Sequence, residues 1–205
     1  MDKQAEAFET HYRDYLDRIS QTSFENVGQQ LGLEVHDAGL VVHLFNRKYS
    51  VFKDRIEDDD NNRPHYGICV IIAQYILRCP QSDVEHKSRW VAFKDFKKMS
   101  MFTNENFFRT DCEQAIANHF SNQLENLDAA SQKLGGRHVD LGLSYDRIIQ
   151  FDALPTISLL LLFNDSDELF PTECKVLFQA HAEDYLDPES LAMTGAALAQ
   201  RLKEA

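Results

Sequence analysis

The sequence predicts one α+β domain over residues 1–205, with a mixed or antiparallel central sheet packed by about five helices. Two strand-like segments support this class: the run Leu154–Phe163 is the most apolar stretch of the chain, and Cys174–Ala180 resumes strand character after the acidic cluster Asn164–Pro171. Helical patterns lie before, between and after the strand-like segments. They do not alternate with the strands in regular βαβ order, so α+β is favoured over a parallel α/β sheet.

The apolar run predicts the central strand of the sheet. Pro155 and the acidic turn after Phe163 leave it about nine residues, which is strand length and too short to cross a membrane. A strand that is apolar on both faces lies in the middle of a sheet, so we place Ile157–Phe163 there. Tyr145–Phe151 is rich in β-formers and predicts a neighbouring strand, while the near alternation in Cys174–Ala180 predicts another.

The first 32 residues predict a helical lead-in. Ala5–Ser20 repeats its apolar side chains at the spacing of one helical face. A short second helix follows, in which Ser23 is the expected N-cap and Gly32 the expected end. Turn residues then separate three short strands, which predict a β-meander: Leu33–His36, Leu40–Phe45 and Lys48–Phe52.

The middle of the chain predicts two longer helices around an irregular segment. His65–Cys79 is apolar nearly all round and is ended by Pro80, so a buried helix is expected. Gln81–Met101 has no regular pattern. Thr110–Glu113 matches a capping box and predicts the start of a long helix. Gly135 and Gly136 are expected to end either this helix or its continuation.

The end of the chain predicts a short helical turn at His181–Leu186 and a last helix to about Lys203. Asp187-Pro188-Glu189 supplies a capping aspartate, a proline in the first position and an acid near the positive end of the helix dipole. One face of the last helix carries small residues, which would let another element approach closely: Ala192, Gly195, Ala196 and Ala199.

Composition excludes several classes of partner. The net charge of −12 argues against nucleic acid and against anionic lipid, because both need a basic surface. A hydrophobic content of 43% is enough for a sizeable core. The N-terminus has no apolar signal region, so a cytoplasmic protein is expected. The four scattered cysteines are then expected as reduced core thiols.

Several segments together resemble one known family. They are the Leu33–Val51 meander, Trp90–Phe93, Phe107, His119-Phe120, Ala153–Phe163, Phe170–Glu173, Phe178–Ala180 and Asp184–Leu186. From about Leu33 to Leu202 the chain is similar to an uncharacterised prokaryotic family, domain of unknown function 3786. The resemblance implies mostly anaerobic hosts. Because some relatives carry an added iron–sulfur domain, it also suggests anaerobic redox or one-carbon metabolism. It implies no activity and no catalytic residue.

No motif predicts a metal or a cofactor. Asp58-x-Asp60-x-Asn62 begins like a calcium loop, but Arg63 stands where the loop needs glycine and Cys69 where it needs a terminal acid. The eight histidines show no paired spacing typical of zinc sites, and the cysteines form no C-x-x-C pair. A solvated acidic loop is therefore expected around Asp58, and no metal ligand is assigned.

The candidate recognition segment is Lys87–Arg109. Its first part, Lys87–Lys98, holds five basic side chains against one acid, and aromatic residues are interleaved with them. Cations beside aromatic faces can hold an anionic planar ligand or dock an acidic or redox-protein partner. The expected ligand-binding residues are Arg89, Trp90, Phe93, Lys94 and Arg109. The alternative is a set of core aromatics with lysines on the solvent side.

The leading hypothesis is therefore a non-catalytic module that binds a small anionic ligand or a redox-protein partner. One alternative is an enzyme in which Glu173, His181 and Asp184 perform acid–base chemistry, which requires the three to converge on one cleft. The simpler interpretation of these three residues is surface polarity and helix capping. A third hypothesis is a structural or interaction subunit without a ligand of its own.

Overall fold

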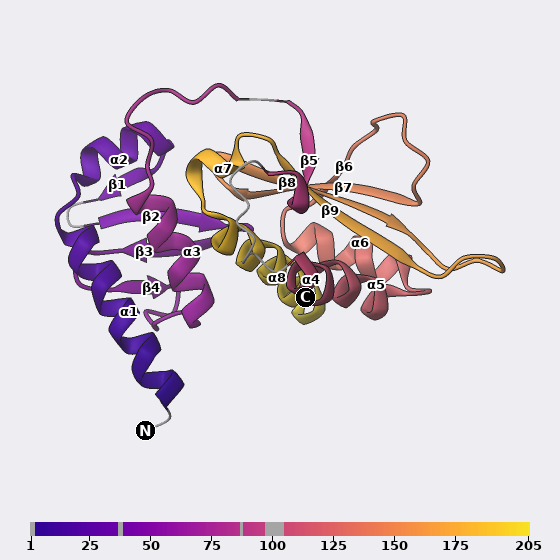
Figure 1. The fold of residues 1–205 in the computed structure, drawn as a ribbon, viewed down its shortest axis with the longest axis horizontal. Helices are drawn as coiled ribbons and strands as arrows, with labels where there is room; N and C mark the ends of the chain where they lie inside the picture. Colours follow the sequence, from indigo (N-terminus) through magenta and orange to yellow (C-terminus); the bar gives the residue numbers. More distant parts are fainter. Residues whose placement is uncertain (1–2, 37–38, 87, 97–104) are drawn as a thin grey trace.

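Two antiparallel sheets form the frame of the computed structural model, which describes residues 3–36, 39–86, 88–96 and 105–205 (Figure 1). The four-stranded sheet has the order β1-β2-β3-β4 and the five-stranded sheet the order β5-β9-β8-β7-β6. The strands of the first are β1 (Glu34–His36), β2 (Gly39–Leu44), β3 (Arg47–Val51) and β4 (Ile56–Asp58). Those of the second are β5 (Trp90–Ala92), β6 (Arg137–His138), β7 (Arg147–Leu154), β8 (Ile157–Asn164) and β9 (Glu173–Gln179).

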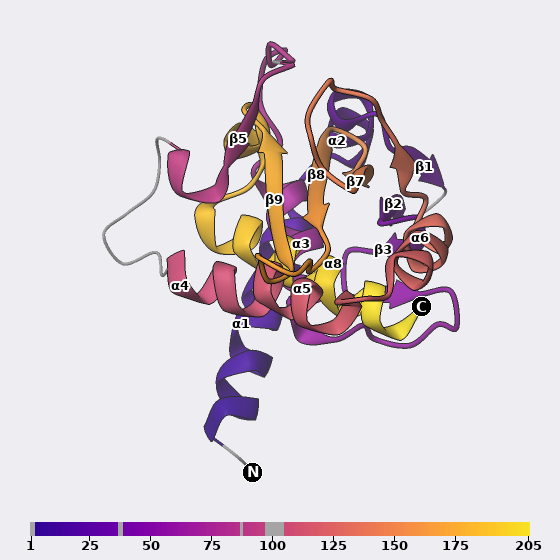
Figure 2. The same ribbon diagram turned by 90° about the vertical axis from the view of Figure 1, so that its right-hand side faces the viewer.

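Helices cover one face of the five-stranded sheet and pack beside the other sheet. The N-terminal half contributes α1 (Lys3–Ser20), α2 (Phe24–Leu31) and α3 (Tyr66–Leu77). The C-terminal half contributes a 3-10 turn (Phe93–Asp95), α4 (Glu105–Phe108), a π-helical turn (Arg109–Gln114), α5 (Ala115–Phe120), α6 (Leu124–Lys133), α7 (Ala182–Tyr185) and α8 (Pro188–Glu204). Helices α4, α5, α6 and α8 all lie on one side of the five-stranded sheet (Figures 1 and 2). Helix α8 runs between the two halves (Figure 1).

The predicted α+β class and the central strand are confirmed. Strand β8 lies between β7 and β9 in an antiparallel ladder, as the continuous apolar run predicts. Successive side chains of β8 alternate between the helix-covered core and the opposite face. On that opposite face a second, smaller apolar cluster forms around Ile148, Leu160 and Leu162.

The two sheets share one hydrophobic core. A single cluster of buried residues extends from Ile19 in α1, through Phe45 between the sheets, to Leu198 in α8. The backbone N–H of Phe45 donates to the carbonyl of Ala153 at 3.0 Å, which links the end of β2 to β7. Packing is therefore continuous across the junction.

The last helix is built as its first residues predict. The Asp187 carboxylate accepts a hydrogen bond from the Ser190 N–H at 2.8 Å, and Pro188 occupies the first turn. Its small-residue face admits a close neighbour at Gly195, where an added Cβ would lie 2.4 Å from Cε2 of Phe108. The ring of Phe108 in turn stacks on Phe93, with centroids 4.5 Å apart.

The predicted helix start at Thr110–Glu113 is wrong. The helix already begins at Glu105, and Thr110 and Glu113 lie inside its π-helical turn, which has no side-chain cap. Two contacts explain the difference: Phe108 must be helical to fill the space above Gly195, and the Glu113 carboxylate accepts from the Val176 N–H at 3.1 Å. Glu113 thus satisfies a backbone donor of β9 and does not complete a capping box.

The predicted long helix is also interrupted after Phe120. Asn122 adopts a left-handed conformation, with φ 59°, and α6 begins two residues later at Leu124. The Asn122 N–H donates to the Asp165 carboxylate at 2.7 Å, which ties this turn to the β8–β9 loop. Asparagine tolerates this conformation better than most residues, so a helix break at Asn122 is physically reasonable.

The predicted meander is confirmed and has a fourth strand that the sequence analysis missed. Strand β4 pairs with β3, and the polar loop begins only after Asp58. In that loop the Asp58 carboxylate accepts from the backbone N–H groups of Asp60 and Asn62, so it caps its own turn. Residues 37 and 38 of the predicted β1–β2 turn lie outside the described residues.

Candidate functional site

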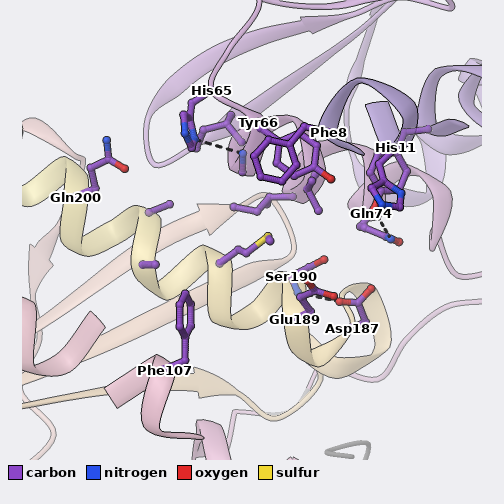
Figure 3. Close-up of a pocket in the computed structure, with 18 residues that line it drawn as sticks. Phe8, His11, His65, Tyr66, Gln74, Phe107, Asp187, Glu189, Ser190 and Gln200 are labelled. Carbon is purple, nitrogen blue, oxygen red and sulfur yellow. Dashed lines mark hydrogen bonds between the residues drawn. The ribbon is translucent and has the colours of Figure 1, made fainter. Parts of the chain in front are cut away.

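A cavity of about 460 Å³ opens between α1, α3 and α8 (Figure 3). Its walls come from both halves of the chain, and Phe107 of α4 adds an aromatic ring at the α8 side. The volume lies within the range of about 300–1,000 Å³ that small-molecule sites occupy. It is lined by Phe8, His11, Tyr15, His65–Ile68, Val70, Ile71, Gln74, Phe107, Asp187, Glu189, Ser190, Met193, Ala196, Ala197 and Gln200.

An aromatic pair forms one wall of the cavity. The rings of Phe8 and Tyr66 are stacked, with centroids 4.1 Å apart and planes 13° apart. The position of Tyr66 follows from the start of α3, where Nδ1 of His65 accepts a hydrogen bond from the Gly67 N–H at 3.3 Å. Burial raises the pKa of the Tyr66 phenol, and the nearby Tyr15 and Glu189 add to the effect. Tyr66 is therefore a neutral hydroxyl at neutral pH, able to donate or accept a hydrogen bond.

The opposite wall is the face of α8. Ala196 and Ala197 have small side chains that leave space beside the helix, and Met193, one turn nearer the capped end, adds a flexible thioether. Phe107, which is 50% exposed, leaves part of its ring accessible to solvent. Small side chains beside a flexible one make a wall that can adapt to a ligand.

The polar groups of the cavity are neutral or acidic. Gln74 donates to the Tyr15 hydroxyl at 3.4 Å, and the Asp187 carboxylate is engaged as the cap of α8. Glu189, at the N-terminal end of α8, is exposed. The lining includes the histidines at positions 11 and 65 but no lysine or arginine of the described chain. Such a surface suits a neutral or positively charged ligand better than an anion.

The structure separates Trp90 and Phe93, the two aromatic residues that the sequence analysis assigned to ligand binding. Trp90 pairs with Gln179 and packs, half-buried, against the small apolar cluster on the helix-free face of the sheet. Phe93 is 3% exposed and stacks on Phe108 in the main core. The ring of Phe93 is thus a core element, as the alternative interpretation expected, and Trp90 does not share a surface with it.

The basic residues of that segment are exposed. Arg89, Lys94 and Arg109 all lie at the surface, and none lines the α1/α3/α8 cavity. The remaining basic residues of the segment, at positions 87, 97 and 98, lie outside the described residues. Ligand binding by Arg89, Trp90, Lys94 and Arg109 stays a prediction.

The structure does not bring the predicted acid–base residues together. Glu173 begins β9, whereas His181 and Asp184 follow its other end, so the strand separates Glu173 from His181 by roughly 20 Å. His181 is fully buried, and its Nε2 lies 3.1 Å from the carbonyl of Thr156, to which it donates. Its ring also packs beside His86, with centroids 4.6 Å apart. His181 therefore contributes to the packing under the β7–β8 turn.

No local sequence pattern predicts the cavity, because its residues come from four separate helices, α1, α3, α4 and α8. In the sequence, Phe8 belongs to the apolar face of the expected helix Ala5–Ser20, and Tyr66 lies in no motif. The one available signal was the small-residue face of α8: Gly195 receives Phe108, while Ala196 borders the cavity. Spacing alone does not tell which small residue receives a neighbour and which leaves a space.

Within the described residues, no group of three or more histidine, cysteine, aspartate or glutamate side chains is arranged to hold a metal ion. Among the same residues, no helix combines the length and the apolar composition needed to span a bilayer.

Comparison with known proteins gives one match. Searches of curated proteins and of solved structures found no match. The sequence profile of a family described as "Domain of unknown function (DUF3786)" matches residues 23–201, which include β1 to β9 and most of α8. The match covers well over half of the chain, so this protein belongs to the DUF3786 family.

Proposed function

We propose that this protein is a ligand-binding module whose α1/α3/α8 cavity holds a small, largely apolar molecule with a neutral or positively charged polar end. The observation that carries the proposal is the lining itself. An aromatic pair, a methionine and two alanines surround a space of about 460 Å³, and carboxylates are its only fully charged side chains among the described residues.

The walls favour a flat apolar body. The stacked Phe8 and Tyr66 offer an aromatic surface, and the α8 face opposite them is low and adaptable. Burying apolar area of a ligand between such walls contributes about 25 cal/mol per Å² before the costs of association. Aromatic contacts of this kind add about 0.5–1.5 kcal/mol each.

The charges favour a cation at the α8 end. Glu189 is an exposed acid beside the cavity, and its effect on the pKa of Tyr66 places its charge near the aromatic wall. An anionic ligand would meet this carboxylate without a basic residue of the lining to offset it. This proposal therefore differs from the anionic ligand that the basic segment Lys87–Arg109 suggested.

A matched series of indoles tests both parts of the proposal. Indole, tryptamine and indole-3-acetate share one ring system and are neutral, cationic and anionic, respectively. We expect saturable binding by calorimetry in the order tryptamine, indole, indole-3-acetate. Glu189→Gln should reduce the difference between tryptamine and indole, because it removes the charge and keeps the shape.

A filled-cavity variant provides the control for location. Ala196→Phe places a ring in the cavity and should abolish binding, while Ala129→Phe, on the exposed surface of α6, should leave binding unchanged. Equal binding of all three indoles, or binding that survives Ala196→Phe, would contradict the proposal.

A second candidate function rests on the helix-free face of the five-stranded sheet. Trp90 lies there half-buried at the edge strand, beside Leu177 and near the exposed Arg89. We propose this edge as the place where an acidic or redox-protein partner would dock, in the anaerobic metabolism that the family resemblance suggests. Arg89→Ala should weaken such a complex and reduce its salt dependence, and an unchanged affinity would remove the candidate.

A further inference from the structure

A second cavity, of about 310 Å³, lies where the ends of α6 and α8 meet the β2–β3 turn. Its lining includes Phe45, Asn46, Arg47, Lys133, Arg201 and Glu204. None of these residues lines the α1/α3/α8 cavity. It also lies apart from the basic segment that the sequence analysis selected.

A buried arginine forms the inner wall of this cavity. Arg201 is 9% exposed, and its two terminal nitrogens donate to the carbonyl of Leu44 and to the hydroxyl of Tyr49. Both acceptors are neutral. No carboxylate of the described residues lies within ion-pair distance of Arg201, and Glu204, which lines the same cavity, attracts its charge only from farther away.

The surrounding side chains add positive charge. Burial is the largest cause that lowers the pKa of Arg201, and charge repulsion from Arg47 lowers it further, while Tyr49 and Glu204 act in the opposite direction. Lys133 lines the same cavity and donates to a main-chain oxygen of Ala205. The carboxylate of Glu204 accepts a hydrogen bond from Gln200 at 2.8 Å, so it is turned along its own helix. Three basic side chains therefore line the cavity against one acidic side chain.

The backbone that shapes the cavity is rigidly determined. Phe45 and Asn46 have φ angles of 48° and 60°, which are the positive values of a tight hairpin turn, and this turn aims Arg47. Phe45 is anchored by its hydrogen bond to Ala153 and by burial in the core. The Asn46 side chain packs on Gly135, where a Cβ would lie 3.4 Å from Cβ of Asn46. The basic groups are thus held in place before any ligand arrives.

We propose that this cavity binds a small anion through a carboxylate or phosphate group, with the guanidinium of Arg201 as its inner anchor and Arg47 and Lys133 at its rim. A buried charge that no counter-ion contacts is unfavourable, and an oxyanion bound here would place a negative charge in contact with the guanidinium of Arg201. The planar fork of arginine suits both carboxylate and phosphate oxygens. The volume leaves room for an organic body beyond the charged group.

Calorimetry with inorganic phosphate and with malonate, at constant ionic strength held by sodium chloride, tests the site. We expect saturable binding of at least one of them, and the preferred probe identifies the oxyanion geometry. Arg47→Gln should weaken the Kd by about tenfold or more, as for the loss of a charge-assisted hydrogen bond. Lys48→Gln is the matched control, because Lys48 is the next residue of β3, is exposed and does not line the cavity.

Any one of four results would overturn the proposal. The first is no saturable binding of either probe at about 10 mM, a concentration that nearly fills a millimolar site. The second is an equal loss of affinity in Arg47→Gln and Lys48→Gln, which would indicate non-specific charge. The third is a set of ¹⁵N amide shifts on titration that lies away from residues 44–49, 131–136 and 198–204. Arg201→Met, where it folds, should lose binding entirely, and retained binding in that variant would also refute the site.

Discussion

Replacing Gly195 by alanine is expected to destabilise the protein, although alanine is the better helix former. An added Cβ at Gly195 would lie 2.4 Å from Cε2 of Phe108 and 3.1 Å from Sγ of Cys112. The Phe108 ring cannot move aside freely, because it is 3% exposed and stacks on Phe93.

The size of the effect follows from two opposing contributions. Overpacking a core position costs typically about 1–3 kcal/mol. Removing a helical glycine returns up to about 1 kcal/mol. The free energy of unfolding should therefore fall by about 1–2 kcal/mol, which corresponds to a decrease in Tm of about 2–8 °C for a chain of this size.

Urea denaturation provides the measurement, with the slope m unchanged if the native and unfolded states stay comparable. Gly67→Ala is the matched control, because a Cβ there meets only His65, at 3.6 Å. That variant should be neutral or slightly stabilised. Combining Gly195→Ala with Phe108→Leu should recover part of the unfolding free energy lost in Gly195→Ala, since leucine does not reach the position of the added Cβ. A Gly195→Ala protein as stable as the wild type would refute the packing argument.

Three further predictions concern the N-cap of α8, the reactivity of the cysteines and the loss of stability at acid pH. Asp187→Ala should lower the unfolding free energy by about 1 kcal/mol in urea titrations, because the Ser190 N–H loses its acceptor, whereas Asp187→Asn should retain most of it. Iodoacetamide labelling followed by mass spectrometry should modify Cys79 first in the native protein, since the other three cysteines are buried, and prior labelling of a buried thiol would contradict the structure. The hydrogen bonds from Arg137 hold the pKa of Asp152 below its ordinary value, so the pair stabilises the fold above about pH 4 and loses this effect as the pH falls through the lowered pKa. Arg137→Met should therefore cost less than about 1 kcal/mol at pH 7 and flatten the acid limb of the stability curve; an unchanged acid limb would show that the pair contributes nothing.

The strand assignments were predictable because a single physical requirement decides each of them. The run Ile157–Phe163 is apolar on both faces, and only a strand in the middle of a covered sheet has both faces buried. The helix cap at Asp187 was predictable for a similar reason, because it needs only the Asp187 carboxylate and the backbone N–H of Ser190, three positions later. Features that depend on a few neighbouring residues can be predicted from one sequence.

The errors arose where tertiary contacts decide the local structure. Glu113 has the spacing of a capping box, yet its carboxylate serves a backbone donor of β9 some sixty positions further along the chain. The break at Asn122 depends on Asp165, which belongs to a different hairpin. Neither partner can be identified from helix propensity, because propensity is a weak prior that such contacts override.

The candidate sites were harder to predict than the fold for the same reason. Phe8 and Ala196 line one cavity from helices almost the whole chain apart, and Arg47 and Arg201 meet at another. The sequence drew attention to the dense basic run before α4, whereas the buried arginine, which no carboxylate of the described residues contacts, lies among the alanines and leucines of α8. Local charge density was therefore a poor guide to where charge is buried.

The shared interior of the two sheets determines how the molecule tolerates being cut. A protease that cut between α3 and β5 would divide the chain between the two sheets (Figure 1). Cleavage there would leave each fragment with an apolar surface that the other fragment covers in the intact protein. The two fragments share one buried cluster, and the Phe45 N–H donates to the Ala153 carbonyl across the junction. The nicked halves should therefore migrate as one particle in size-exclusion chromatography and come apart only when denaturant melts both together.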